Sequence, residues 1–385
     1  MPMRGPLDGV RVIEMAGMGA APFAAMMLAD AGADVLRIDR ITDVPSEADP
    51  PPRKSHLRGR RSVAIDLKNP SATGLLLELV SAADVLIEGY RPGTMERLGL
   101  GPQECLAANP RLVYVRATGW GQTGPLAPRA GHDINYVALS GVLHMIGPAG
   151  EPPVPPVNFL GDIGGGAYIA AFGAVTGVVS SIRTGKGRVI DAAMLDGASY
   201  MATMFHGQLA TGSWEDERGA NDFDGGAPWY GCYETKDGRF IAIGAYEQHF
   251  YDELLGVLGL DSAELPDRAD KNQWPALRRA LAARIRTRTR DEWEKLADGK
   301  DACLSPVLSM KEAPDHPHNM ARDAFMGDPP VPSPAPRFDG HTVGSATPAQ
   351  AGAQSRSGLR EWGVAHHRIE ELHRVGAVMS FGSGE

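Results

Sequence analysis

Short apolar runs alternate with helix-like stretches through the first 120 residues. The runs expected to form buried strands are 10–15, 34–40, 84–90 and 111–120. Between them, residues 21–32 and 71–83 have a helical pattern, and Ser71 is the expected N-cap of the second helix. Alternating strands and helices predict a parallel sheet, in which ligands gather beyond the carboxyl ends of the strands.

The second half of the chain has a different pattern of hydrophobic and polar residues, which indicates a second, smaller domain. From about residue 229 the pattern predicts a hairpin that turns at Asp237 and Gly238, a helix at 249–258 and a charged helical stretch at 275–296. Segment 328–355 is rich in Pro, Ala, Gly and Ser, so we expect an extended connector rather than packed structure. A final helix within 359–376 closes the chain.

Composition excludes several classes of protein. The 385 residues are 43% hydrophobic and 22% charged, and no apolar run approaches the ~18 residues that a membrane span needs. The net charge of -9 argues against a nucleic-acid surface. The three cysteines are widely spaced, which predicts neither disulfides nor a thiolate metal site, and no signal peptide is evident. We therefore expect a cytoplasmic protein.

Asp162 lies in NFLGDIGGG, before a predicted long helix of small residues at 162–181. An aspartate just before a helix is most often an N-cap that binds free backbone N–H groups. The glycines that follow, Gly164 to Gly166, would leave N–H groups at a positive helix end. Such groups can also hold the enolate oxygen of a bound thioester. Both roles stay open at this point.

His132 lies in GHDINY, in a loop that enters a predicted helix. It could serve only as a local cap, but neutral histidine is also a competent base near pH 7. Asp133 is too close in sequence to be the obvious carboxylate that orients it. Glu247, which ends the segment IAIGAY in the smaller domain, is the alternative partner, unless it is an ordinary exposed carboxylate. A histidine and an aspartate on opposite sides of one C–H bond are the minimum equipment for racemisation.

Basic residues cluster near the second predicted strand. They are Arg37, Arg40, Arg53, Lys54, Arg58, Arg60 and Arg61. Most such clusters are solvated faces, but several of these side chains could converge on phosphates, which arginine binds in bidentate fashion. Arg91 in EGYRPG is placed similarly. GMGAAP lacks the third glycine of a dinucleotide loop, so we predict no NAD.

The motifs in chain order resemble those of the family III CoA-transferase superfamily. The resemblance covers nearly the whole chain and rests on GPLDGVRVIEM, GADVLRIDR, ADVLIEGYRPGTMERLGLG, RLVYVRATGWGQTGP, GHDINY, NFLGDIGGG, GKGRVIDAAMLDG and GGAPWYGCYETKDGRFIAIGAYE. It implies an α/β fold with a Rossmann-like parallel-sheet large domain and a smaller α+β domain, in an interlocked homodimer. We expect the large domain at 1–200 with 330–385 returning to it, a linker at 201–228 and the small domain at 229–329.

The resemblance also implies roles for individual residues. His132 and Asp162 match the two proton carriers of racemases in this superfamily, and Glu247 matches the carboxylate that orients the histidine. Arg40 and Arg91 fall in motifs that resemble CoA-contacting ones, and Asp133 lies beside the base in the implied CoA pocket. Arg61 is included with these expected CoA-binding residues.

The expected activity is 1,1-proton transfer on a 2-methylacyl-CoA thioester, through an enolate, in fatty-acid and lipid metabolism. CoA is part of the substrate, and no cofactor or metal is expected. One alternative is a CoA transferase with Asp162 as covalent nucleophile. Those enzymes share the aspartate but lack the histidine of GHDINY, so His132 favours the racemase. A non-catalytic acyl-CoA-binding protein is the other alternative. The natural acyl group is left open.

Overall fold

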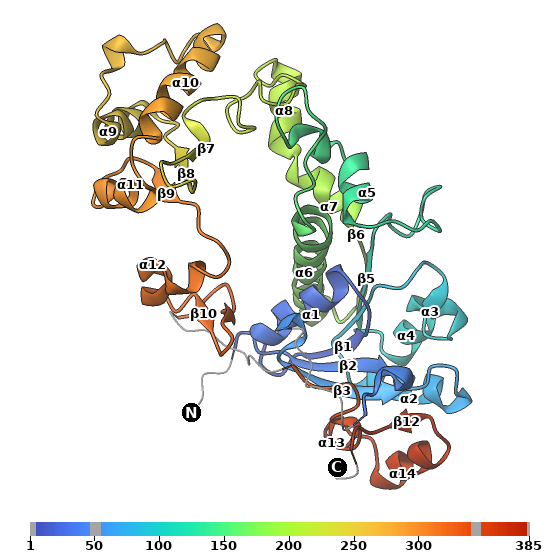
Figure 1. Cartoon of the computed structure of the whole chain (residues 1–385). Coiled ribbons are helices and arrows are strands. Elements are labelled where there is room, and N and C mark those ends of the chain that lie inside the picture. Colours follow the sequence, from blue (N-terminus) through green and yellow to red (C-terminus); the bar gives the residue numbers. More distant parts are fainter. Residues whose placement is uncertain (1–4, 47–54, 340–347, 383–385) are drawn as a thin grey trace. The chain divides into compact units, whose positions relative to one another are not determined.

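The computed structural model describes residues 5–46, 55–339 and 348–382, and its contacts divide the chain into two compact units (Figure 1). The first unit comprises 1–140, 156–201 and 323–385, and the second comprises 141–155 and 202–322. Two differences from the expected ranges stand out. Residues 141–155 belong to the second unit, and the segment expected as a linker contains helix α8 (Thr203–Thr211).

A seven-stranded sheet forms the centre of the first unit. Its strands are β1 (Arg11–Met15), β2 (Asp34–Arg40), β3 (Arg60–Ile65), β4 (Val85–Glu88), β5 (Val113–Thr118), β6 (Arg188–Ala193) and β12 (Val378–Met379), in the order β12-β3-β2-β1-β4-β5-β6. All neighbours are parallel except β12, which pairs antiparallel with β3. The predicted α/β fold with a parallel sheet is confirmed. The chain order reverses between β1 and β4, and ligands bind beyond the carboxyl ends of strands at such a point.

Helices cover both faces of this sheet. They are α1 (Ala20–Asp30), α2 (Pro70–Ser81), α3 (Thr94–Arg97), α4 (Pro102–Ala108), α5 (Asp133–Leu139), α6 (Ile169–Thr184), α7 (Met194–Met201), α13 (Ser355–Glu361) and α14 (His366–Arg374). Successive strand side chains point to opposite faces. Ile13 therefore packs in one core with α2 and α14, and Val12 packs in the other with α1 and α6.

Two local expectations in the first unit are wrong. Asn69, not Ser71, caps α2, because its side-chain oxygen accepts the Ser71 N–H at 3.0 Å while Pro70 opens the helix. The final helical stretch is two helices, α13 and α14, separated at Gly363, whose φ of +96° interrupts helical backbone.

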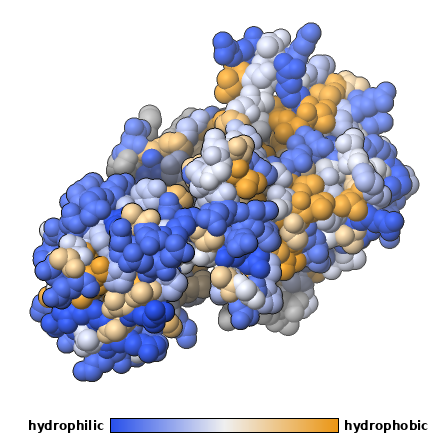
Figure 2. Space-filling view, turned by 90° about the horizontal axis from the view of Figure 1, so that it is seen from above, coloured by the Kyte–Doolittle hydropathy of each residue, from blue (hydrophilic) through white to orange (hydrophobic). Residues whose placement is uncertain are grey.

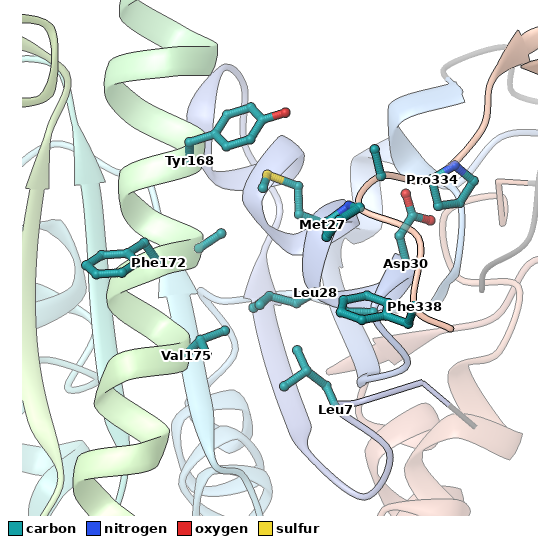
Figure 3. A pocket seen from close by; sticks show the side chains of 13 residues that line it. Leu7, Met27, Leu28, Asp30, Tyr168, Phe172, Val175, Pro334 and Phe338 are labelled. Atoms are coloured by element: carbon teal, nitrogen blue, oxygen red, sulfur yellow. The ribbon is translucent and has the colours of Figure 1, made fainter. Parts of the chain in front are cut away.

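The Pro-rich segment is packed in part, which corrects its expected role as a free connector. Strand β11 (Val331–Pro332) pairs with β10 (Phe325–Met326), and the Arg58 side chain donates to the Pro332 carbonyl at 3.1 Å. Pro334 is buried, and Phe338 lines an apolar cavity of about 340 Å³ with side chains of α1 and α6 (Figure 3). Proline and phenylalanine here therefore supply packing surface as well as chain length.

The long helix of small residues begins earlier than predicted and is a π-helix at first. This π-helix, η4, spans Phe159–Tyr168 and continues into α6. Together, Phe159–Thr184 are long and apolar enough to cross a membrane by length and composition alone, a run that the sequence analysis did not recognise. The helix packs on β5, β6, α1 and α7.

The second unit is a small α+β assembly. Strands β7 (Tyr230–Glu234), β8 (Phe240–Gly244) and β9 (Leu304–Pro306) form an antiparallel sheet, which confirms the predicted hairpin. Its helices, besides α8, are α9 (Gln248–Leu258), α10 (Trp274–Ile285), α11 (Arg290–Ala297) and α12 (Pro317–Ala321). The predicted stretch at 275–296 is thus two helices, because Thr289 and Glu292 form a capping box that starts α11.

Short 3₁₀ helices complete the described elements. They are η1 (Ile41–Asp43), η2 (Ser55–Leu57), η3 (Val142–Met145), η5 (Ser262–Glu264), η6 (Lys271–Gln273) and η7 (Ala313–Asp315).

Candidate active site

Glycines allow η4 to approach its neighbours closely, and this packing positions Asp162. A Cβ on Gly165 would lie 2.7 Å from the Ala198 backbone nitrogen, and one on Gly197 would lie 1.9 Å from the Gly165 carbonyl oxygen. Real Cβ atoms do not fit at such distances, so α7 crosses η4 backbone to backbone. The glycines read from the sequence as a helix entrance therefore lie inside the helix, where they permit close packing.

Asp162 is the fourth residue of η4 rather than its N-cap, which corrects the first of its two expected roles. Its carboxylate is half-buried and accepts a hydrogen bond from the Asn158 side chain at 3.1 Å. Gly19, which begins α1 just after β1, faces this carboxylate: a Cβ there would lie 3.4 Å from Asp162 Oδ1. Asp162 thus lies beside the loop that follows β1, where the strand order reverses.

The Asp133 carboxylate occupies the start of η4. Asp133 Oδ2 accepts the backbone N–H groups of Gly161 at 2.6 Å and of Asp162 at 2.7 Å. These two N–H groups are therefore not free to hold an enolate oxygen, as the sequence analysis expected of groups near Asp162. The Asp133 side chain is buried and directed at η4, so the structure does not place its carboxylate as a direct CoA contact.

The surroundings of Asp162 favour its protonated form. Burial raises the pKa of Asp162 above its ordinary value, the hydrogen bond from Asn158 opposes this shift, and the negative charge of Asp133 adds to it. The positive charge that His132 can carry acts in the opposite direction. A carboxyl group with a raised pKa can serve as an acid as well as a base near neutral pH.

His132 is exposed at the N-cap of α5, so the histidine and Asp133 are neighbours on one helix end. Its backbone N–H donates to the Asn135 side-chain oxygen at 3.0 Å, which fixes the chain where α5 begins. His132 acts electrostatically on Asp162, so the structure brings these two predicted proton carriers into one neighbourhood.

Tyr136 of α5 contacts Trp120 and Gly131 and lies within electrostatic reach of Asp162. Its ring packs edge-on against Trp120, 4.7 Å between centroids, and its hydroxyl donates to the Gly131 carbonyl. Burial raises the pKa of Tyr136, the charge of Asp162 adds to this, and Arg91 opposes it. Arg91 therefore lies within electrostatic reach of the same helix.

The loop that carries Arg91 rests on an ion network. Glu88, at the end of β4, accepts the Tyr90 N–H at 2.7 Å and pairs with Arg116 at 3.0 Å. Arg116 in turn binds Glu96 of α3 at 2.8 Å. Arg40 ends β2 at the same edge of the sheet. Burial raises the pKa of the half-buried Tyr90, and the positive charge of Arg40 partly opposes this rise. Both arginines are exposed at the carboxyl edge.

Most of the basic cluster has a structural role, which corrects its expected convergence on phosphates. Arg37 pairs with Asp39, Arg58 with Asp30 and Arg60 with Glu14, each at 2.6 Å and buried. Arg61 lies at the amino-terminal end of β3, opposite the site, and binds Asp34 at 3.3 Å and Glu361 at 2.8 Å. Arg61 is thus not brought to the site. Arg53 and Lys54 lie outside the described residues.

Glu247 belongs to the second unit, whereas His132 and Asp162 belong to the first. It is exposed and occupies the N-cap position of α9. Its role as the carboxylate that orients His132 stays a prediction from the resemblance.

Three contributors to the site were missed from the sequence: Asn158, Tyr136 and Gly19. Asn158 stands four residues before Asp162 and Tyr136 four residues after His132, a spacing that places side chains on one helix face. That spacing was the available signal. Gly19 was read only as part of a weak dinucleotide loop, and its φ of +73° required the structure.

The apolar cavity of the first unit does not include these residues. Tyr168 and Val175 point toward Met27 and Leu28 across it, whereas the ring of Phe172 turns to the other side of the helix (Figure 3). Asp30, the one carboxylate among the described residues of its lining, is bound by Arg58. The candidate site is therefore the N-terminal end of α5 together with the start of η4, and not this cavity.

Comparison with known proteins agrees with the fold and the motifs. Residues 7–351 match CoA-transferase family III, and the chain belongs to this family. It is 42% identical over 378 residues to the alpha-methylacyl-CoA racemase of Mus musculus, covering 95% of this chain and 96% of that protein. The alpha-methylacyl-CoA racemase of Homo sapiens is 44% identical over 320 residues, covering 83% of this chain and 82% of that protein. The crystal structure of a CAIB/BAIF family protein from Brucella suis superposes with a TM-score of 0.78 at 26% identity, covering 94% of this chain and all of that one.

Proposed function

We propose that this protein is a racemase that interconverts the epimers of 2-methylacyl-CoA thioesters by 1,1-proton transfer. The observation that carries the proposal is the placement of His132 at the start of α5 and Asp162 in η4, within electrostatic reach of each other. Two groups that can each exchange a proton near neutral pH are what the reaction needs. The names of the relatives at 42% and 44% identity support the same activity.

In the proposed mechanism the thioester carbonyl acidifies the hydrogen on the neighbouring carbon. For one epimer His132 takes that proton, giving an enolate, and protonated Asp162 delivers its proton to the opposite face. For the other epimer the Asp162 carboxylate takes the proton and protonated His132 returns one. The raised pKa of Asp162 supports this exchange of roles, since it makes the protonated carboxyl more accessible than in an exposed aspartate.

Isotope exchange tests the proposal directly. A single epimer of a 2-methylacyl-CoA, incubated with the protein in deuterated water, should gain deuterium at the α-carbon and epimerise without any acyl acceptor. A CoA transferase would instead require a second carboxylic acid and form an Asp162 adduct that hydroxylamine traps. A binding protein would do neither. Absence of exchange under all these conditions would refute the racemase.

We also infer that CoA phosphates bind at the carboxyl edge of the sheet, through Arg40 and Arg91. Both side chains are exposed there, and guanidinium groups bind phosphate in bidentate fashion. Their replacement by alanine should raise KM more than it lowers kcat. In this proposal the reaction needs no metal or cofactor, so treatment with a chelator leaves the rate unchanged.

We further infer that the chain forms a homodimer. One face of α6 exposes Phe172, Val175, Val179 and Ile182 at helical spacing, and β6, an edge strand of the sheet, exposes Val189 beside it. Figure 2 shows that apolar residues, in orange, gather in patches among polar surface on the face in view. Exposed apolar faces of this kind mark interfaces. Sedimentation should give twice the mass of one chain, and Ile182→Asp should weaken the association.

The proposed setting is the cytoplasm, in fatty-acid and lipid metabolism. The three cysteines are free, with Cys232 and Cys303 exposed, which suits a reducing compartment. Fractionation of cells that express the chain from its natural source, with blotting of each fraction, would check this.

A further inference from the structure

We propose that Asp133 is a positioning residue that holds Asp162 in place through the backbone of η4 and sets a negative charge beside it. The inference rests on the proposed function, because it concerns one of the two proposed proton carriers. It assigns Asp133 a task other than contact with CoA.

The first observation is geometric. One oxygen of Asp133, Oδ2, accepts two consecutive backbone N–H groups, those of Gly161 at 2.6 Å and Asp162 at 2.7 Å. One of these amides belongs to Asp162 itself, so a single carboxylate fixes the peptide from which the proposed acid and base projects. Hydrogen bonds to an ionised acceptor are the strong ones.

The second observation is the absence of a side chain at position 161. A Cβ on Gly161 would lie 2.6 Å from Asp133 Oδ2 and 3.1 Å from its Cα. Glycine is therefore the residue that lets α5 come close enough for the Asp133 carboxylate to reach both amides. The two hydrogen bonds therefore depend both on the Asp133 carboxylate and on the missing side chain of Gly161.

The third observation concerns charge. Asp133 is 6% exposed, its Oδ1 is buried and receives no hydrogen bond from the described residues, and no cationic side chain among them pairs with it. Among the described residues, the negative charge is therefore balanced by the two amides alone, and it repels negative charge on Asp162. This repulsion contributes to the raised pKa of Asp162, after burial.

The other described groups around Asp162 do not place a negative charge beside its carboxylate. From α5, the charged and titratable neighbours are His132, which acts in the opposite direction, and Tyr136, which is itself influenced by Asp162. Asn158 donates a neutral hydrogen bond. Gly19 before α1 and Met201 of α7 bring neutral atoms to η4. Asp133 is thus the neighbour whose charge disfavours ionised Asp162.

The test compares Asp133→Asn, Asp133→Ala and the matched control Asp84→Asn in the full chain. Asp84 also accepts a backbone N–H, from Arg11 at 2.9 Å, but at the amino-terminal edge of the sheet. Asp133→Asn keeps the shape and an acceptor oxygen and removes the charge. Asp133→Ala removes both hydrogen bonds.

With the epimer whose α-proton Asp162 takes, we expect the acid limb of kcat/KM in Asp133→Asn to move down by about one pH unit, because a like charge beside Asp162 is gone. For Asp133→Ala we expect kcat to fall about a hundredfold with KM changed less, because a misplaced acid slows the chemical step. Asp84→Asn should leave both unchanged. An unmoved acid limb in Asp133→Asn would contradict the proposal, as would Asp133→Asn failing to fold while Asp84→Asn folds.

A measurement without substrate separates this inference from the proposed function. Infrared titration of the free protein follows the carboxyl band of Asp162, identified by its loss in Asp162→Asn. The band should titrate at lower pH in Asp133→Asn than in the wild type. If the wild type shows no α-proton exchange but this shift is present, the proposed function fails and the positioning role stands. If exchange is present and the band does not move, the positioning role fails alone.

Discussion

At the scale of single residues, the chemistry depends on the protonation of one carboxyl group. Asp162 is half-buried between Asn158, Gly19 and the end of α5, and burial with the Asp133 charge raises its pKa. A carboxyl with a raised pKa keeps a proton to higher pH than an exposed one. Protonation of Asp162 therefore affects the rate at a higher pH than protonation of an exposed aspartate would.

The acid limb of wild-type kcat/KM should therefore lie above the ordinary range of an aspartate. For the epimer whose α-proton Asp162 takes, protonation of Asp162 as the pH falls through its raised pKa removes the base that starts the reaction. The pH profile with the 2-methylacyl-CoA epimer that Asp162 deprotonates measures the limb. A limb at the pKa of a free aspartate would contradict the environment described.

Asn158→Ala should move the same limb in the opposite direction to Asp133→Asn. The side-chain amide of Asn158 donates to Asp162 Oδ2 and favours the ionised form, so its loss raises the pKa of Asp162 further. We expect an upward shift of up to about one pH unit. Asn272→Ala in the second unit, where the Asn272 side-chain amide likewise donates to an aspartate, Asp270, at 3.0 Å, is a matched control. Equal profiles for Asn158→Ala and the wild type would refute the role.

At the scale of elements, close helix contacts built on glycine hold η4 against α5 and α7. The sequence shows the glycines, but a glycine in a sequence does not reveal which partner approaches it. That is why Gly164 to Gly166 were taken as an open helix entrance and why the start at Phe159 was missed. The strands β1, β2, β4 and β5 were predictable because each is a short apolar run with turn residues at its ends.

Gly197→Ala should destabilise the protein strongly, by roughly 3 kcal/mol or more, because its Cβ would lie 1.9 Å from a backbone oxygen that cannot move aside. Gly74→Ala, in α2 of the same unit, has nothing within 4 Å of the new Cβ. That change should stabilise the protein by up to about 1 kcal/mol, since alanine favours the helix. Thermal or urea unfolding of both variants measures the contrast, and similar stabilities would contradict the close contact.

The buried ion pair of Glu14 and Arg60 joins β1 to β3, and its loss should be costly. Arg60→Met leaves Glu14, which is fully buried, without its partner, so we expect about 3 to 5 kcal/mol of destabilisation. Burial raises the pKa of Glu14, and it is the carboxylate form that the interior disfavours. The destabilisation should therefore shrink as the pH falls and Glu14 becomes protonated. Glu14→Gln with Arg60→Met should recover part of the loss, and no recovery would contradict the account.

At the scale of the whole molecule, the sequence predicted the α/β class, the sheet and the hairpin unit, but not which basic residues are available. Arg37, Arg58 and Arg60 have acidic partners on other elements, and such pairs appear only when the elements are assembled. Arg61 pairs with Asp34 and Glu361 at the amino-terminal edge of the sheet, and these pairs too appear only when the elements are assembled. Of the candidate site, the neighbourhood of His132 and Asp162 was predictable from motifs. The carboxylate under Asp162 was not, because Asp133 reaches η4 across 28 residues of sequence.

The central claim is that one of His132 and Asp162 removes the α-proton of the substrate and the other delivers a different proton to the opposite face of the same carbon. The most direct measurement follows α-deuterium incorporation and epimerisation of a single 2-methylacyl-CoA epimer in deuterated water, for the wild type, His132→Ala and Asp162→Ala. Each residue as a general acid or base contributes about 10² to 10⁴ in rate, so each replacement should reduce epimerisation by that factor. The wild type should exchange and epimerise without an acyl acceptor. Wild-type rates of both processes in His132→Ala and Asp162→Ala would contradict the claim.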